Sequence, residues 1–179
     1  MTKENIRPAK LVDSVQPQWY ACYTRSRSEK ITETQLLQAG IECYLPLIRT
    51  RRKWSDRLKW VDIPLIRSYI FVRVSQDNFT RVLSADSVVR FITFENKAVP
   101  IPDNQIETIR LLLNQGAELE VVSKRFEPGD KVVVQAGPFL GLQGELVQYR
   151  GKHKVLIRLG EMNECLLVTL PLELLMRDY

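Results

Sequence analysis

The densest cluster of chemically active side chains is a basic run that extends from Arg49 to Trp60. Six Lys and Arg residues surround a single acid, Asp56, and Trp54 and Trp60 are interleaved with them. Guanidinium and ammonium groups neutralise phosphates, and indole rings stack on exposed bases. The pattern predicts a segment that binds nucleic acid, with a solvated basic hairpin as the alternative. Its candidate contact residues are Arg49, Arg51, Arg52, Lys53, Trp54, Arg57 and Lys59.

The basic excess of the chain is confined to its first two thirds. The protein has 179 residues and a formal net charge of +5. Residues 1–115 contain 18 Lys and Arg against 12 Asp and Glu, whereas residues 116–179 contain 8 against 9. Arg25 and Arg27, next to a predicted helix, extend the candidate nucleic-acid-binding surface, although an ordinary solvated helix face explains them equally well. We infer an anionic partner for the N-terminal part.

The residue types that carry catalysis or bind metals are few and unsuitably spaced. His153 is the only histidine, and the three cysteines, Cys22, Cys43 and Cys165, have no C-x-x-C spacing. A dyad of Cys165 and His153 lacks a recognisable orienting acid and oxyanion motif. The sequence also has no Walker loop, Rossmann glycine pattern or paired-carboxylate motif. We therefore expect a protein that is not an enzyme and has no metal or cofactor.

The hydropathy pattern predicts a cytoplasmic protein without a membrane partner. No run of about 18 uncharged apolar residues occurs, which is the length that a membrane-spanning helix requires. The first residues, Met1 to Asn5, also lack the apolar core of a signal peptide.

The elements that must position the basic run begin after a polar stretch. Residues 1–17 show no apolar period and predict a flexible arm. The aromatic run Trp19–Tyr23 predicts a buried strand. Ser26 and Glu29 have the spacing of a capping box, so they predict the start of a helix that Gly40 ends. The apolar side chains expected on this helix are Ile31, Leu36 and Leu37.

Alternation and turn signals predict further strands and two more helices up to residue 115. A reversal near Ser55–Asp56 predicts a hairpin with arms near residues 48–54 and 57–63. Asp103 is expected to cap the last helix, which Gly116 ends. The other expected features are strands over 68–74 and 88–94, a short helix carrying Phe79, Val82 and Leu83, and an apolar face of Ile106, Ile109 and Leu113 on the last helix. This order fits an α+β sandwich with a mainly antiparallel sheet.

The last third of the chain is rich in glycine and in short strands. Strands are expected over 131–135, 144–149, 153–159 and 165–170, and such spacing predicts a small β-barrel. Its Val and Gly content favours this barrel over a helical hairpin. The predicted organisation is an arm over 1–17, a domain over 18–115, a linker over 116–123 and a barrel over 124–179, the two domains moving independently.

Two sets of motifs resemble one known family. Gly129-Asp130 before a Val-rich strand, followed by Gly137-Pro138-Phe139-Leu140-Gly141-Leu142-Gln143-Gly144, resembles the KOW motif, which ribosomal proteins also contain. The stretches that resemble the NusG N-terminal domain are Trp19-Tyr20, Gly40-Ile41-Glu42-Cys43-Tyr44-Leu45-Pro46 and Pro64-Leu65-Ile66-Arg67-Ser68-Tyr69-Ile70-Phe71-Val72. The resemblance covers residues 18–178 and implies an NGN-type α/β sandwich followed by a KOW barrel of the SH3-like or Tudor-like kind.

The resemblance implies a transcription elongation and antitermination factor that suppresses pausing or termination. In the family, an apolar pocket of the N-terminal domain binds the clamp helices of the largest RNA polymerase subunit. That pocket carries over to Trp19, Tyr20, Ile66 and Tyr69, with Phe71 beneath, and we expect an open groove there. Many relatives have Phe-Pro-Gly-Tyr or Phe-Pro-Ser-Tyr where this chain has Ile66-Arg67-Ser68-Tyr69, so the anchor and the turn are altered.

The finer expectations concern the branch of the family and its partners. The compact domain and basic hairpin look most like the operon-specific RfaH and UpxY types, and the basic residues are expected to contact upstream or non-template DNA. In relatives the barrel binds ribosomal protein S-ten or the Rho factor, and its expected contact edge here is Phe139, Leu140 and Leu142, with barrel core as the alternative. The protein is expected to be a monomer. The alternative functions are a ribosome-associated protein that binds RNA through the KOW barrel, and an adaptor without a nucleic-acid contact.

Overall fold

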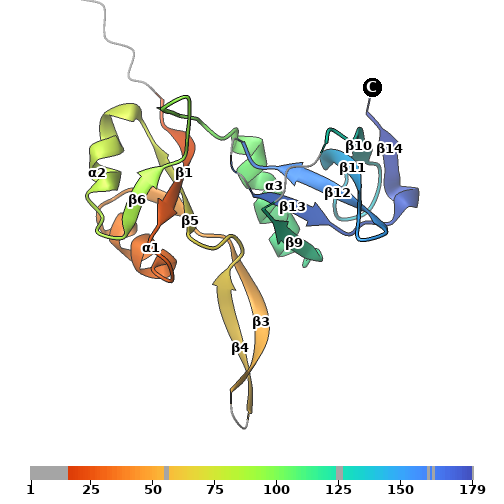
Figure 1. The fold of residues 1–179 in the computed structure, drawn as a ribbon, viewed down its shortest axis with the longest axis horizontal. Coiled ribbons are helices and arrows are strands. Elements are labelled where there is room, and N and C mark those ends of the chain that lie inside the picture. The colour runs from red at the N-terminus through yellow and green to blue at the C-terminus, as the bar shows by residue number, and fades with distance from the viewer. Residues whose placement is uncertain (1–15, 55–56, 124–126, 161, 163, 179) are drawn as a thin grey trace, which may run out of the picture.

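Two sheets and a projecting hairpin organise the part of the chain that the structure describes. The structure is a computed structural model, and it describes residues 16–54, 57–123, 127–160, 162 and 164–178. In Figure 1 the N-terminal sheet and the C-terminal barrel lie on opposite sides of helix α3, and the hairpin of β3 and β4 extends away from both.

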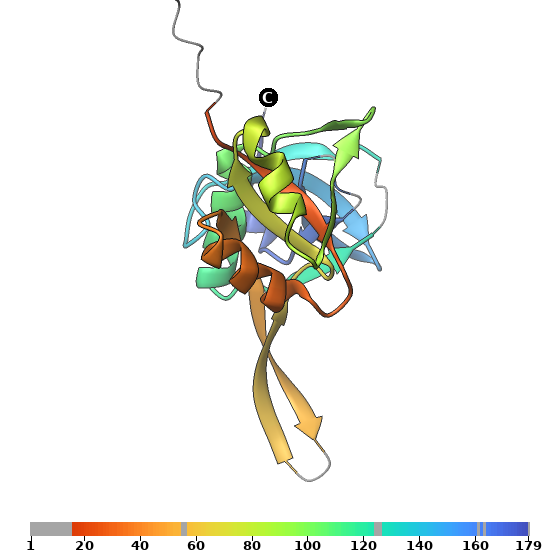
Figure 2. The same ribbon diagram turned by 90° about the vertical axis from the view of Figure 1, so that its left-hand side faces the viewer.

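The N-terminal sheet has four antiparallel strands in the order β2-β5-β1-β6. The strands are β1 (Gln18–Thr24), β2 (Glu42–Tyr44), β5 (Tyr69–Val74) and β6 (Val88–Phe91). Helices α1 (Glu29–Gln38) and α2 (Phe79–Leu83), with the 3-10 turn η1 (Gln76–Asn78) before α2, lie against one face, and α3 (Asp103–Asn114) lies on the other side (Figure 2). The small strands β7 (Thr93–Phe94) and β8 (Lys97–Ala98) pair between β6 and α3.

Each face of this sheet has its own core, because side chains alternate along a strand. On β1, Tyr20 and Cys22 point toward α1 and α2 and pack with Leu36. Trp19 and Ala21 point to the opposite face and belong to a second cluster, which includes α3. Because both faces of the strand are covered, the whole run from Trp19 to Cys22 is buried.

Helix α1 begins later than the capping-box spacing predicted. Its N-cap position is Ser28, which makes no side-chain capping bond, and Ser26 lies outside the helix. The Glu29 carboxylate instead accepts a hydrogen bond from the backbone N–H of Ser68 at 2.8 Å. A tertiary contact has therefore taken the place of the local one. Of the expected apolar side chains only Leu36 is buried, whereas Ile31 and Leu37 are more than half exposed.

The predicted hairpin is confirmed, with slightly longer arms. Strand β3 (Leu47–Trp54) pairs with β4 (Arg57–Pro64) through a continuous antiparallel register that ends at Trp54 opposite Arg57. Ser55 and Asp56, where the reversal was expected, lie outside the described residues. The hairpin contains most of the basic run and projects from the body of the protein in both ribbon views (Figures 1 and 2).

Helix α3 occupies the predicted span, with two local differences. Its N-cap position is Pro102, and Asp103 is the first helical residue, without a side-chain cap. The buried face consists of Ile106, Ile109 and Leu112, while Leu113 is only partly buried. Asp103 instead pairs with Arg73 of β5 at 3.3 Å, which ties the start of the helix to the sheet.

The C-terminal sheet has six strands in the order β14-β10-β11-β12-β13-β9 and curves into the barrel. Its elements are β9 (Leu119–Val122), β10 (Asp130–Val134), β11 (Gln143–Tyr149), β12 (Lys152–Arg158), β13 (Cys165–Val168), η2 (Leu172–Leu174) and β14 (Leu175–Arg177). The four expected strands are present. Strand β9 lies inside the expected linker 116–123, because Leu119 and Val121 are partly buried and the strand pairs with β13.

The glycine-rich turn of the barrel has the geometry that the motif indicated. Gly141 has a φ of +82°, a conformation that favours glycine. A Cβ on Gly144 would lie 2.4 Å from Val155 Cγ1, so only glycine permits this close approach of β11 to β12. Phe139 is buried in the core between these features.

Candidate binding surfaces

Three of the four predicted polymerase-binding residues meet in one apolar cluster. Trp19 of β1, Ile66 of the β4–β5 turn and Tyr69 of β5 are 3%, 1% and 9% exposed. All three belong to the core on the α3 side of the sheet, where Phe71 is fully buried, as expected. Residues from separate segments are therefore brought to one face, which their positions in the sequence could not establish.

Tyr20 lies apart from this cluster. Its ring packs edge-on against Phe79 at 5.0 Å and Phe91 at 6.0 Å, on the α1 and α2 side of the sheet. Its hydroxyl donates a hydrogen bond to the Gln18 side chain at 3.3 Å. The expectation that Tyr20 shares a surface with Trp19 differs from the structure, because consecutive strand residues point to opposite faces.

The cluster of Trp19, Ile66 and Tyr69 is covered by α3 and the barrel, so the open groove expected at these residues is not present. One continuous core joins the sheet face, the buried face of α3 and the inner barrel residues. At its edge the Gly160 N–H of the barrel donates to the Gln105 side chain of α3 at 2.9 Å. The two domains share a core here, which differs from the expectation that they move independently.

A polar contact with Glu164 holds Tyr69 on the barrel side. Burial, together with a hydrogen bond to the Glu164 side chain, raises the pKa of the Tyr69 hydroxyl well above its ordinary range. The protonated hydroxyl is therefore the donor, and the carboxylate is the acceptor. Glu164 Oε2 is buried and has no hydrogen-bond partner among the described residues. The contact consequently buries a carboxylate that is only partly satisfied, which weakens the barrel side of the interface.

One cleft remains beside the covered cluster. It has a volume of about 390 Å³ and lies between the hairpin base, the β4–β5 turn and β9. Ile66 and Arg67 line it from the N-terminal domain, and Leu119, Val121 and Glu164 line it from the barrel side. The interface between the domains is thus incompletely packed next to Ile66.

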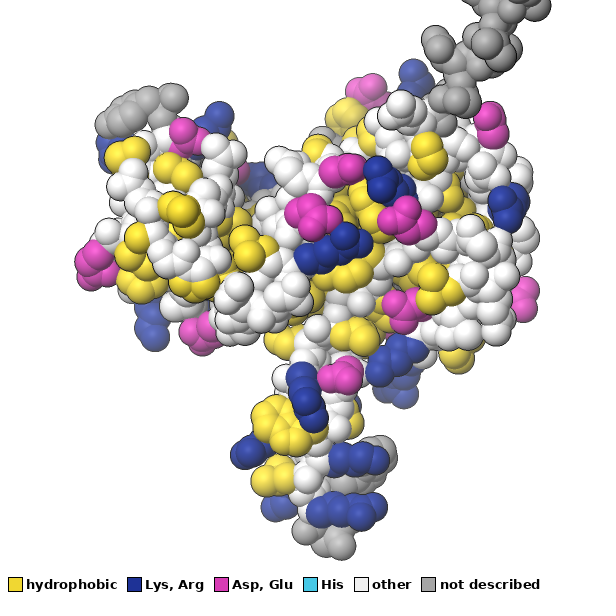
Figure 3. All heavy atoms as spheres, turned by 180° about the vertical axis from the view of Figure 1, so that it is seen from behind, with side chains coloured by type: hydrophobic (Ala, Val, Ile, Leu, Met, Phe, Trp, Pro, Cys, Tyr) yellow, Lys and Arg dark blue, Asp and Glu magenta, His cyan; other side chains and the backbone are white. Residues whose placement is uncertain are grey.

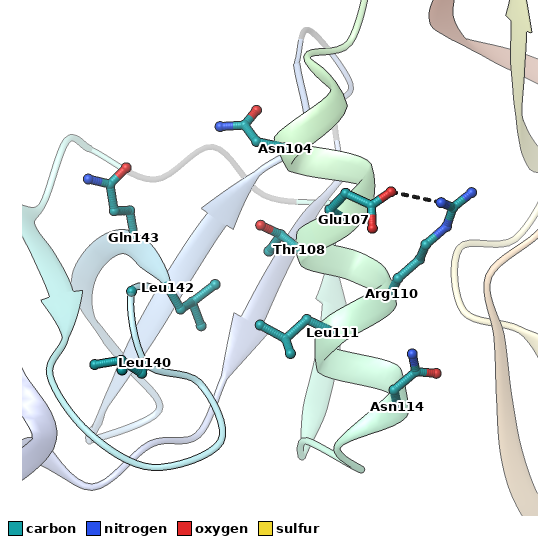
Figure 4. A pocket seen from close by; sticks show the side chains of 10 residues that line it. Asn104, Glu107, Thr108, Arg110, Leu111, Asn114, Leu140, Leu142 and Gln143 are labelled. Atoms are coloured by element: carbon teal, nitrogen blue, oxygen red, sulfur yellow. Dashed lines mark hydrogen bonds and ion pairs between the residues drawn. The ribbon is translucent and has the colours of Figure 1, made fainter.

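The guanidinium of Arg110, a residue of α3, lies over two aromatic rings of the N-terminal sheet. Its guanidinium is 5.6 Å from the ring centre of Trp19 and 4.8 Å from that of Tyr44. The same guanidinium pairs with Glu107 at 2.7 Å (Figure 4). Neither Arg110 nor Tyr44 was predicted as a site residue, and their association depends on tertiary packing of α3 against β1 and β2.

The hairpin displays its cations and one indole ring to solvent. Cross-strand pairing places Arg51 opposite Trp60, and the guanidinium groups of Arg49 and Arg51 lie 5.4 and 4.7 Å from the Trp60 ring centre. Trp60 is 50% exposed, so a ring face remains accessible to a stacked base. Figure 3 shows Lys and Arg side chains gathered along the projecting hairpin, in contrast to the mixed charges of the body.

The remaining predicted basic residues are also exposed. Arg52 and Lys59 face each other on the opposite side of the hairpin, and Lys53 and Arg57 lie toward its tip. Trp54 ends β3, and its side chain lies outside what the structure describes. The β1–α1 loop holds Arg25 and Arg27, both exposed.

Only one of the three expected barrel contact residues is exposed. Phe139 and Leu142 belong to the barrel core, whereas Leu140 is 67% exposed. Figure 4 shows Leu140 and Leu142 on the barrel side of a cleft of about 650 Å³, opposite Thr108 and Leu111 of α3.

The structure separates the two residues of the hypothetical catalytic dyad. Cys165 lies opposite Arg158 at the end of β12, whereas His153 lies near the start of that strand. Five residues of strand place them about 17 Å apart, too far for a proton transfer. Among the described residues, no group of three or more His, Cys, Asp or Glu side chains is arranged to hold a metal ion. No helix within the described ranges is long and apolar enough to cross a membrane.

Comparison with known proteins identifies the family. The family model described as "Transcription termination factor nusG" matches residues 17–110, which is more than half of the chain. The chain belongs to the NusG family. The matched region contains the N-terminal sheet, helices α1 and α2, the first part of α3 and the basic hairpin.

This chain is also similar to solved protein structures. The solved structure described as "Domain interaction in Thermotoga maritima NusG" is 22% identical in sequence to this chain, with a TM-score of 0.52. The match covers 93% of this chain and 99% of that one. The MjSpt4:Spt5 complex in conformation A is 14% identical, with a TM-score of 0.31, over 89% of this chain and 97% of that one. The likeness to the Thermotoga protein supports the fold alone.

Proposed function

We propose that this NusG-family protein is a non-enzymatic transcription elongation factor that binds RNA polymerase through Trp19, Ile66 and Tyr69. The observation that carries the proposal is the meeting of these three side chains on one face of the N-terminal sheet, within the region that matches the family model. A cluster of aromatic and aliphatic side chains suits an apolar contact with helices of the polymerase clamp. Such anchors contribute about 2 kcal/mol or more each.

Binding at this face requires the barrel to separate from the N-terminal domain. The three anchor residues are covered in the closed arrangement, and a partner helix cannot replace the barrel without exposing them first. The apparent affinity for polymerase is then reduced by the fraction of molecules that are open. The partly satisfied Glu164 and the cleft beside Ile66 favour opening at this boundary.

The finer assignment is an operon-specific antitermination factor of the UpxY type. Support comes from the compact N-terminal domain and from a basic hairpin that is free of the body. The hairpin residues and Arg25 and Arg27 contact upstream or non-template DNA, where exposed bases are available for stacking on Trp60. The clearest test is affinity purification from cells followed by mapping of the bound genes, in which occupancy of a few long operons supports a specialist and occupancy of most genes contradicts it.

The barrel recruits a second protein, such as ribosomal protein S-ten or Rho. Its exposed Leu140 is the remaining apolar candidate on the loop that the KOW motif defines. The alternative of a ribosome-associated RNA-binding protein receives less support, because residues 116–179 have 8 Lys and Arg against 9 Asp and Glu. Strong binding of purified RNA in the absence of polymerase would favour that alternative.

The proposal is tested by capturing polymerase with the full chain and with a Tyr69→Ala variant. Loss of polymerase capture by Tyr69→Ala is expected, whereas Phe94→Ala, which removes an exposed aromatic ring elsewhere, is expected to bind normally. Because removal of a buried ring also lowers stability, far-UV circular dichroism at the assay temperature checks that Tyr69→Ala is still folded. Undiminished polymerase capture by a folded Tyr69→Ala protein would refute the assigned surface.

A further inference from the structure

A cavity of about 660 Å³ lies where the β1–α1 loop, α1, the hairpin and the β4–β5 turn come together. Figure 2 shows α1 next to the base of the hairpin. The cavity is lined by Ser26, Arg27, Glu29, Lys30, Arg52, Ile63, Pro64 and Arg67. Its four cations come one from each of these four segments, so that only the tertiary structure brings them together.

The charge of this cavity is strongly positive and not balanced internally. The four cations face one lining carboxylate, Glu29, which gives a formal charge of +3. Glu29 is buried, and its Oε1 already accepts the Ser68 N–H. Among the described residues, Arg27, Arg52 and Arg67 take part in no ion pair. A concave site with one sign of charge concentrates the field and attracts an anion.

Two tertiary hydrogen bonds and two residues with left-handed φ values hold the backbone around the cavity. Arg27 and Ser68 have φ values of +61° and +62°, in the left-handed region that costs a non-glycine residue about 1 kcal/mol or more. The bond from Ser68 to Glu29 ties the β4–β5 turn to the start of α1. Lys30 Nζ donates to the Asp62 carbonyl oxygen at 2.7 Å, which holds the ammonium at the hairpin base with two further N–H donors available.

The hairpin extends this site in one direction. Arg52 lines the cavity, and cross-strand pairing places Lys59 beside it on the same face of the hairpin. Arg57 lies further along that face toward the tip, because alternate residues of a strand share a face. A ligand that fills the cavity and continues along this face needs negative charges at regular intervals, which is the chemistry of a phosphodiester backbone.

We infer that this cavity holds one backbone phosphate of a single-stranded nucleic acid, and that the strand continues along the Arg52, Lys59 and Arg57 face of the hairpin. The planar guanidinium forks of Arg27 and Arg67 suit bidentate contacts with phosphate oxygens. The inference rests on the nucleic-acid contact of the proposed function and names its anchoring site. The competing occupant of the cavity is an acidic surface of a protein partner, and the experiment below distinguishes it from a nucleic acid.

The test measures binding of a fluorescent oligothymidylate to the full chain over a series of salt concentrations. The Arg27→Gln/Arg67→Gln variant is compared with Arg90→Gln/Lys97→Gln, which removes the same charge from exposed positions outside the cavity. Loss of one phosphate contact lowers the slope of log affinity against log salt by about 0.7. We expect this change, with about tenfold weaker binding, in the cavity variant alone. When Arg67→Lys, which keeps the charge, replaces Arg67→Gln in the cavity variant, most of the salt slope should return.

Unchanged oligonucleotide binding by the cavity variant would overturn the inference, and so would any of three further outcomes. The first is an equal loss of affinity in the cavity variant and its matched control. The second is binding of thymidine monophosphate at the cavity as tight as that of the oligonucleotide, which indicates a small-anion site. The third is loss of polymerase capture by the cavity variant with unchanged oligonucleotide binding, which assigns the cavity to an acidic protein surface. If Arg27→Gln/Arg67→Gln does not fold, Arg52→Gln gives the same measurement from the hairpin side.

The result of this experiment does not depend on the polymerase contact of the proposed function. The polymerase contact depends on Tyr69, which does not line the cavity. A Tyr69→Ala protein that loses polymerase and still binds the oligonucleotide leaves the cavity assignment intact. A cavity variant with normal oligonucleotide binding and normal polymerase capture refutes only the phosphate site.

Discussion

The two candidate binding surfaces, the hairpin and the covered cluster, differ in their exposure to solvent. The hairpin keeps its cations and Trp60 in solvent, on two strands that project from the body. The cluster of Trp19, Ile66 and Tyr69 is buried beneath α3 and the barrel. Charged groups are well solvated in water, whereas exposure of apolar side chains to water costs free energy. The polar surface is therefore accessible in the described arrangement, whereas the apolar one would become accessible only if the domains separated.

The largest effect is expected from comparing two tryptophans, one in each region. Trp19→Ala removes a buried ring and should lower the free energy of unfolding by about 3–5 kcal/mol. Trp60→Ala, on the exposed hairpin, should change it by less than about 0.5 kcal/mol. Chemical denaturation with urea measures both. Similar losses for the two variants would show that the hairpin is integrated into the folded core.

The second prediction concerns the basic face of the hairpin. Replacing Arg51, Arg52 and Lys53 by Gln should lower the salt slope of single-strand binding by about 2, since each phosphate contact contributes about 0.7. Affinity should fall by up to about 100-fold, while the unfolding midpoint stays unchanged. A triple replacement of Arg90, Lys97 and Lys152 matches the charge loss. An unchanged slope in the hairpin variant would remove the hairpin from the nucleic-acid surface.

A smaller effect is expected when one hydrogen bond between α3 and the barrel is removed, which should expose the apolar cluster in a larger fraction of molecules. Gln105→Ala deletes the hydrogen bond from Gly160 that links α3 to the barrel, which is worth about 1 kcal/mol. A larger open fraction should then strengthen polymerase capture up to about fivefold. Gln143→Ala removes a bond to Asp178 within the barrel and serves as the control. Weaker capture by Gln105→Ala would show that polymerase binds the closed form.

The smallest predicted effect is the share of the alkaline pH dependence of stability that comes from Tyr69 of the covered cluster. Burial and Glu164 raise the folded pKa of Tyr69 above its unfolded value of about 10. Between these two values the folded state holds more protons than the unfolded one, so stability falls as pH rises. Below about pH 10 the contribution is complete. Thermal unfolding of Tyr69→Phe should show a smaller alkaline slope than the unaltered protein, with the rest coming from Tyr44 and the cysteine thiols, whose pKa values burial also raises. An undiminished slope would show that Tyr69 does not contribute to it.

Local sequence patterns were sufficient to predict most of the strands, the hairpin and the family. Apolar and aromatic runs located β1 and β5, and the turn between two basic arms located β3 and β4, because both signals are local. The glycines of the barrel loop indicated close approaches and turns, which Gly144 and Gly141 confirm. The cationic composition of residues 49–59 likewise predicted an exposed basic surface.

Packing between distant parts of the chain established which of these residues lie together. Alternation placed Tyr20 and Trp19 on opposite faces, and packing of α3 and the barrel covered Trp19 and Tyr69. The predicted linker supplied β9, and the basic cavity gathered Arg27 and Arg67 from segments 40 residues apart. Periodicity specifies which side chains leave the solvent, but the partner that buries them comes from distant parts of the chain.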